Sequence, residues 1–189
     1  MRERTWTIFF AVGLATSAIA AVLGPDAQAL LTLPLGIAGT AAAFITAKRN
    51  PGAARDTWTL FGLGGLLFLL SGVVRAVLYD PDVVVFPSVA DGLFAAGYIS
   101  LIVGTYRMGN VRSAERKWAA ILDGWIVAIG AATAMWSLVL WPYMVDSSVP
   151  LNARLANGAF SLMATALLAG ATRLAVGPGA RTTSWYLLA

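Results

Sequence analysis

The sequence predicts an all-α fold: a polytopic bundle that spans a membrane six times, begins a seventh span and keeps its N-terminus in the cytoplasm. Three observations predict it. Hydrophobic residues make up 59% of the 189 residues and charged residues 12%, about half the share in soluble domains. Apolar stretches long enough to cross a bilayer as helices alternate with short polar breaks. The basic residues gather in every second break.

Six apolar stretches approach the roughly 20 residues that a helix needs to cross a bilayer. They are apolar on every face, whereas the strands of a membrane barrel alternate in polarity. The breaks between them contain glycine, proline, asparagine and aspartate, which end helices and form turns. We therefore treat residues 1–189 as one transmembrane domain. The predicted spans are 6–23, 27–47, 57–78, 89–105, 118–141 and 155–176.

The first apolar stretch has two interpretations. Arg2 and Arg4 precede it, and Ala18-Ile19-Ala20 has the small-residue pattern of a signal-peptide cleavage site. The chain retains Met1, which a processed secreted protein would have lost. We therefore interpret the stretch as the first transmembrane helix.

The positive-inside rule gives the orientation, because basic residues are enriched in cytoplasmic loops. With the N-terminus inside, only Arg75 and Arg154 fall toward the outer side. This asymmetry accounts for the net charge of +4 without a nucleic-acid partner, and it predicts a multi-pass protein of the bacterial inner (plasma) membrane. The basic residues on the cytoplasmic side are Arg2, Arg4, Lys48, Arg49, Arg55, Arg107, Arg112, Arg116, Lys117, Arg173 and Arg181.

A weak repeat predicts the seventh span. The segment "PGARTTSWYLLA" from Pro178 matches "PGAARDTWTLFG" from Pro51 at five of its twelve positions. In the earlier copy we expect Asp56 and Thr57 to cap a helix, as Thr183 and Ser184 would in the later one. Residues 184–189 therefore look like the start of a further span in a longer protein. The alternative is that any two helices that enter the membrane from the same side need similar turn and cap residues, which would produce these matches without a repeat.

The composition excludes most catalytic chemistry. The chain has no cysteine and no histidine, so thiol catalysis, thiolate zinc sites and imidazole bases are absent. It has no phosphate-binding glycine loop, nucleophile elbow or paired carboxylates. We predict no enzyme activity, no catalytic residue, no cofactor and no metal for this chain.

Charged and polar residues inside apolar spans are the remaining candidates, since such residues are costly in lipid. Ser88 and Asp91 have capping-box spacing, with Ser88 as N-cap of the fourth span. Arg75 lies one turn inside the third span. It can extend to the headgroups or pair with Asp80, Asp82 or Asp91. An ion pair between Arg75 and Asp91 would hold the third and fourth helices together, and we call this pair the staple.

Asp123 lies about a turn and a half into the fifth span. Its side of the helix carries mostly small residues, which favour close helix packing in lipid. We therefore expect Asp123 to face the bundle, either hydrogen-bonded to a neighbouring helix or as a proton or ligand group. The residues of this row are Ala119, Ala120, Val127, Gly130, Ala131 and Ala134.

Three strings carry a family resemblance. Residues Pro87 to Tyr98 read P-S-x-A-D-x-x-F-x-x-G-Y, Trp58 to Leu67 read W-x-L-x-G-L-G-x-L-L, and Leu122 to Val127 read L-D-x-W-I-V. Together they resemble the N-terminal membrane region of bacterial, actinobacterial-type cyclic-di-GMP signalling proteins. In that family this region precedes cytoplasmic GGDEF and often EAL domains. The GGDEF and EAL motifs themselves are absent from these 189 residues.

The resemblance implies a non-enzymatic membrane sensor or anchor that controls a cytoplasmic cyclic-di-GMP module. Its partners would be the lipid bilayer and a second copy, packed through small-residue helix faces. A ligand would act by binding two states of the bundle unequally, and the sequence names no ligand. Two alternatives stay open: part of a small-solute transporter or channel, and a small structural membrane protein. A water-filled cavity reaching Asp123 would favour transport.

Overall fold

The structure is a computed structural model that describes residues 15–16, 25–80, 86–112 and 117–176. The described residues are helical, with short connections and no strand, as the sequence predicts. The elements are α2 (Pro25–Arg49), α3 (Ala53–Leu78), α4 (Val89–Arg112), α5 (Lys117–Met135), η1 (Trp136–Leu140), α6 (Trp141–Val145) and α7 (Leu151–Val176).

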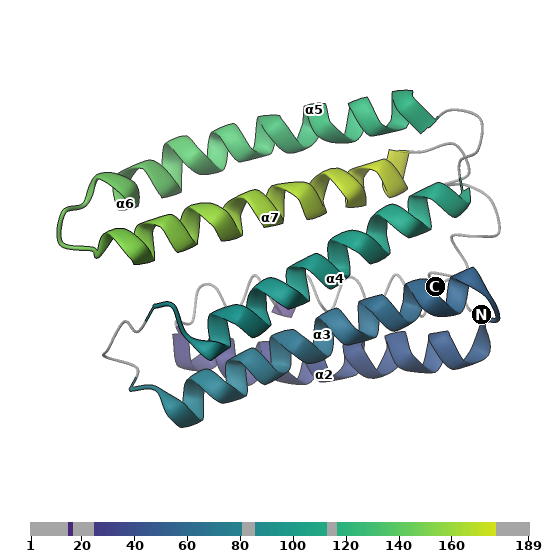
Figure 1. Cartoon of the computed structure of the whole chain (residues 1–189), viewed down its shortest axis with the longest axis horizontal. Coiled ribbons are helices and arrows are strands. Elements are labelled where there is room, and N and C mark those ends of the chain that lie inside the picture. Colours follow the sequence, from purple (N-terminus) through teal and green to yellow (C-terminus); the bar gives the residue numbers. More distant parts are fainter. Residues whose placement is uncertain (1–14, 17–24, 81–85, 113–116, 177–189) are drawn as a thin grey trace.

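The helices lie side by side and successive long helices run in opposite directions (Figure 1). Helix α3 packs between α2 and α4, α4 packs on α7, and α7 packs on α5. We call the end where α3 stops and α4 and α7 begin the Asp91 end, and the opposite end the basic end. Among residues with described side chains, the basic end holds Lys48, Arg49, Arg55, Arg107 and Arg173. The Asp91 end holds Arg75 and Arg154.

Three of the described helices are long and apolar enough to cross a membrane: Ala53–Leu78, Val89–Gly109 and Leu151–Leu174. Large apolar side chains lie on their outer surfaces, with Val77 74% and Leu162 73% exposed. Such a surface suits lipid rather than water. The chain is therefore a helical membrane protein. The predicted first span and the start of the predicted seventh span lie outside the described residues.

The helices extend beyond the predicted apolar spans, because a helix ends at a cap or turn rather than where its apolar part stops. Helix α4 continues to Arg112, and α7 begins at Leu151. The expected cap of α3 is wrong. Gly52, with φ of 63°, is the N-cap and forms no side-chain cap. The Thr57 hydroxyl, already inside the helix, instead donates to the Ala53 carbonyl oxygen at 2.9 Å.

The predicted fifth span ends too early, at residue 141: the chain stays helical to Val145, and the break before α7 covers residues 146–150. Proline lacks an N–H and its ring clashes with the carbonyl one turn earlier in an α-helix. The π-helical segment η1 precedes it, and its Trp141 N–H donates to the Trp136 carbonyl oxygen, five residues back. The wider turn accommodates Pro142, and α6 carries Tyr143 onward to the Asp91 end.

Candidate functional site

Helices α3 and α4 approach closely through glycines. A Cβ atom at Gly64 would lie 3.1 Å from the Gly97 carbonyl oxygen, and one at Gly97 would lie 3.2 Å from that of Gly64. Two serines add hydrogen bonds across the same contact. Ser71 Oγ donates to the Ala90 carbonyl oxygen at 2.8 Å, and Ser100 Oγ donates to that of Leu60 at 2.9 Å. Small residues and hydroxyls are what hold helices together in lipid.

Asp91 joins this contact at its end. The Ser88 N–H donates to Asp91 Oδ2 at 2.9 Å, and the Asp91 N–H donates to Ser88 Oγ at 3.2 Å. This reciprocal pair confirms the capping box. Arg75 Nη2 donates to Asp91 Oδ1 at 2.6 Å, which confirms the predicted staple between α3 and α4. The Asp91 side chain is only 11% exposed, whereas that of Arg75 is 53% exposed.

Tyr98 belongs to an aromatic cluster one to two turns below Asp91. Its ring centroid lies 5.1 Å from that of Phe68 on α3 and 5.2 Å from that of Phe94 on α4. The Phe94 ring also meets Phe160 of α7, edge to face, at 5.1 Å. Such contacts stabilise the packing beyond the area they bury. The structure therefore gives Tyr98 a packing position between α3 and α4.

Helices α4 and α7 form a wedge. At its narrow part a Cβ atom at Gly170 would lie 2.8 Å from Thr105 Cγ2. Toward the Asp91 end the two helices diverge (Figure 1). There Asn152 Nδ2 at the start of α7 donates to the Phe86 carbonyl oxygen at 2.6 Å. That bond and the ring contact between α4 and α7 span the open part of the wedge.

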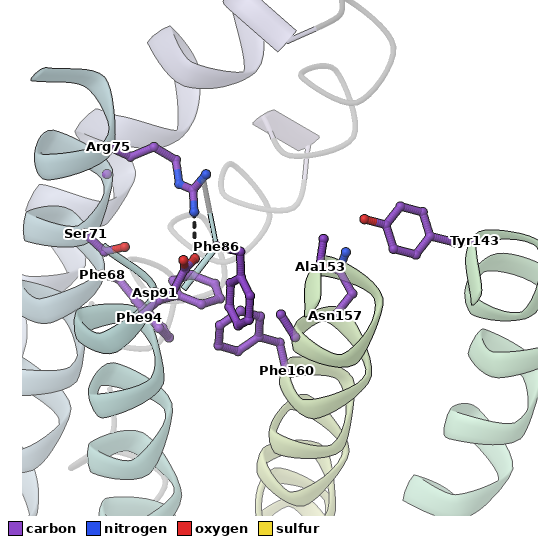
Figure 2. Close-up of a pocket in the computed structure, with 12 residues that line it drawn as sticks. Phe68, Ser71, Arg75, Phe86, Asp91, Phe94, Tyr143, Ala153, Asn157 and Phe160 are labelled. Atoms are coloured by element: carbon purple, nitrogen blue, oxygen red, sulfur yellow. Dashed lines mark hydrogen bonds and ion pairs between the residues drawn. The ribbon is translucent and has the colours of Figure 1, made fainter. Parts of the chain in front are cut away.

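The open part of the wedge is a cavity of about 430 Å³, which Figure 2 shows. This volume lies within the range of about 300–1,000 Å³ found for small-molecule pockets. Its wall comes from α3, Phe86, the start of α4, α6 and α7, so it lies at the Asp91 end. It is lined by Phe68, Ser71, Gly72, Arg75, Phe86, Asp91, Phe94, Tyr143, Ala153, Ala156, Asn157 and Phe160.

Asp123 does not share this site. Its position in the second turn of α5 is at the basic end, and its side chain lies outside what the structure describes. The expectation that its row faces the bundle is wrong for the described members: Val127, Gly130, Ala131 and Ala134 are exposed. Helix α5 instead packs on α7 through the side of the helix that carries Gly124 and the buried Ala128. Gly124 lies so close to α7 that a Cβ atom there would be 2.5 Å from the Ala169 carbonyl oxygen.

The site offers hydrogen-bond donors, one ion pair and aromatic walls. Within the described residues, no group of three or more acidic side chains is placed to hold a metal ion. Comparisons with protein-family models, curated proteins and solved structures give no match for this chain. Function is therefore inferred from the site itself.

The sequence predicted the grouping of Arg75, Ser88 and Asp91 but not the cavity beside them. The missed residues come from α3, from residues 86–94, from α6 and from α7, so no local pattern connects them all. Two signals were present. Asn157 is a polar side chain near the start of the sixth predicted span, and Phe94 belongs to the same string as Asp91. The polar and aromatic cavity residues that were not predicted as site residues are Phe68, Ser71, Phe86, Phe94, Tyr143, Asn157 and Phe160.

Proposed function

We propose that this chain is a membrane sensor and anchor domain that controls a cytoplasmic cyclic-di-GMP module. The observation that carries the proposal is the set of contacts that residues of the P-S-x-A-D-x-x-F-x-x-G-Y string make in the structure. Its Ser88 and Asp91 cap α4, its Asp91 holds Arg75 of α3, and its Phe94 contacts α7. One short string thus joins three helices around a cavity, which is an arrangement suited to sensing.

The proposal includes six membrane spans, a cytoplasmic N-terminus and residence in the bacterial inner membrane. The cavity then lies near the outer side, and the basic end faces the cytoplasm, where an effector would lie. A ligand in the wedge would favour one spacing of α4 and α7 over another. The homodimer expected from the sequence would use the exposed row of α5 that includes Gly130, Ala131 and Ala134.

The transporter alternative receives no comparable support. The cavity lies at the Asp91 end, and its described lining contains no residue of α5. A solute path through Asp123 would have to continue to the basic end. There α4 and α7 are in close contact at Gly170 and Thr105.

The direct test is to determine the gene sequence that follows the codon for Ala189. We expect an in-frame coding sequence for a GGDEF domain, with or without an EAL domain. The second step is to measure cyclic-di-GMP in cells that express the whole protein, either wild type or with Gly97→Leu, which separates α3 from α4. A changed nucleotide level at equal protein abundance supports coupling. A gene without either domain would overturn the proposal.

A further inference from the structure

We propose that the cavity at the Asp91 end binds a small amphiphilic anion, with its carboxylate or phosphate at Arg75 and its hydrocarbon body among the aromatic rings. This inference deepens the proposed function by naming the ligand class of the sensor. It rests on the proposed function only for its biological consequence. Binding itself follows from the cavity and is measured without any effector.

The charges at the site favour an anion. Asp91 already accepts hydrogen bonds at both carboxylate oxygens, from Arg75, from the Ser88 N–H and from the Ser88 hydroxyl. Its role is to hold Arg75. The Arg75 guanidinium has five N–H donors, and one of its nitrogens, Nη2, bonds to Asp91. The Arg75 side chain is 53% exposed and lines the cavity, so its charge is within reach of a ligand there. A cation would meet this positive group and a carboxylate whose two oxygens are already engaged.

Two neutral polar groups lie across the cavity from α3. Figure 2 shows the Tyr143 hydroxyl directed toward the α7 wall, where Asn157 lies. Both side chains line the cavity. Hydroxyl and amide N–H groups donate hydrogen bonds to oxyanions. An anionic head therefore finds a charged donor on α3 and neutral donors on α6 and α7, and binding would link the two sides of the wedge.

The rest of the wall suits a hydrocarbon body. Phe68, Phe86, Phe94 and Phe160 supply ring surface, and Ala153 and Ala156 supply small apolar contacts. Arg75 lies within one turn of the end of α3, so the head would sit near the membrane boundary and the body deeper. Two sources share this chemistry: a free amphiphilic acid and the anionic headgroup of a lipid.

The test places the whole 189-residue chain in nanodiscs of zwitterionic phosphatidylcholine and titrates it with 1-naphthylacetate, read by the ligand's fluorescence. We expect saturable binding of the acid and at least tenfold weaker binding of the neutral amide, 1-naphthylacetamide. The second arm uses native mass spectrometry of the chain from mixed nanodiscs, to detect retained phosphatidylglycerol. Binding in the first arm identifies a free acid, and retention in the second identifies a lipid headgroup.

Three variants assign the site. Arg75→Gln should weaken binding of the acid at least tenfold, and Arg75→Lys should restore part of it. Gly72→Leu should abolish binding without harming the fold, because Gly72 lines the cavity and a Cβ atom there has no atom within 4 Å. The control is Ser161→Ala: the Ser161 hydroxyl donates to the backbone carbonyl oxygen of Asn157 within α7, and its loss should leave binding unchanged.

Failure of both arms would overturn the inference, as would equal binding by wild type and a folded Gly72→Leu variant. Saturable binding of benzyltrimethylammonium, a cation of similar size, would overturn the assignment of charge. Each of these results would leave the proposed membrane anchor intact. The absence of a downstream cyclase, in contrast, would overturn the proposed function while leaving a positive binding result in place.

Discussion

The α3–α4 contact and the α4–α7 contact share one helix but are built differently. Between α3 and α4, glycines bring the backbones together, two serine hydroxyls bond across, and the Arg75–Asp91 pair closes the end. Between α4 and α7 the close approach is near the basic end, and the Asp91 end holds a cavity. From this difference we expect α3 and α4 to keep their spacing, and α7 to change its distance from α4 more readily at the cavity. Helix α4 therefore packs closely on α3 with one side and lines the cavity with another.

The largest expected loss of stability comes from placing a larger side chain in the α3–α4 contact. Gly97→Leu would place a Cβ atom 2.7 Å from the Phe68 ring, which Phe94 and Tyr98 hold in place. Overpacking of this kind costs up to about 3 kcal/mol and sometimes more. We expect a loss of that size in the free energy of unfolding, measured by circular dichroism in mixed micelles. Gly92→Leu on the same helix is the control, because a Cβ atom there has no atom within 4 Å.

The second-largest loss of stability is expected at the polar end of the α3–α4 contact, where Arg75 and Asp91 pair. Asp91→Ala removes a nearly buried acceptor of the Arg75 pair together with the helix cap, so we expect a loss of about 2 kcal/mol. Arg75→Ala removes only the pair, and because Arg75 is half exposed we expect about 0.5–1 kcal/mol. The double variant measures the coupling between them. Additive losses would show that the two side chains do not stabilise each other.

A larger side chain should destabilise the protein more at Gly170, in the narrow part of the wedge, than at Gly158, elsewhere on α7. Gly170→Ala would place a Cβ atom 2.8 Å from Thr105 Cγ2, and α7 must shift to accept it. We expect a loss of about 1 kcal/mol, reduced by the better helix propensity of alanine. Gly158→Ala on α7 meets no atom within 4 Å and should be neutral or stabilising. Equal behaviour of the two variants would contradict the assigned narrow contact.

The smallest effect concerns the connection between α6 and α7, far from the α3–α4 contact. Hydrogen bonds from the side chain and the backbone of Ser148 lower the pKa of the exposed Asp146 carboxyl. A lowered pKa contributes stability above the ordinary aspartate value, and that contribution is lost as pH falls through the lowered pKa. Ser148→Ala should therefore raise the pKa of Asp146, measured by carboxyl carbon NMR. An unchanged pKa of Asp146 would exclude the Ser148 hydroxyl as a cause and leave the backbone N–H of residue 148.

Local patterns in the sequence predicted the polar end of the α3–α4 contact, but not its glycine approach or its serine hydrogen bonds. The capping box depends on residues three positions apart, and the Arg75–Asp91 pair spans a single short connection. The gathering of basic residues in every second break likewise predicted which helix ends lie together. These features depend on neighbours in the chain, so a single sequence reveals them.

The packing of α5 could not be predicted in the same way. The helix is apolar nearly all round, and small residues lie on two faces, so no periodic polar side shows which face is buried. The sequence favoured the face with Gly130 and Ala134, whereas Gly124 and Ala128 make the contact. The cavity was missed because its wall comes from α3, α4, α6 and α7. One lining residue, Tyr143, lies on α6, which follows the π-helical segment η1.

The two sides of α4 should differ most in local opening. At the Asp91 end we expect α4 to stay packed on α3, whereas only the Asn152–Phe86 bond and the Phe94–Phe160 contact hold α7 across the cavity among the described contacts. Hydrogen–deuterium exchange of the chain in nanodiscs tests this difference directly, because exchange reports local opening. Without added ligand, amide exchange should be slow in residues 92–97 of α4 and faster in residues 155–160 of α7. Equal protection of the two segments, or faster exchange in the α4 segment, would contradict a fixed α3–α4 pair beside a movable α7.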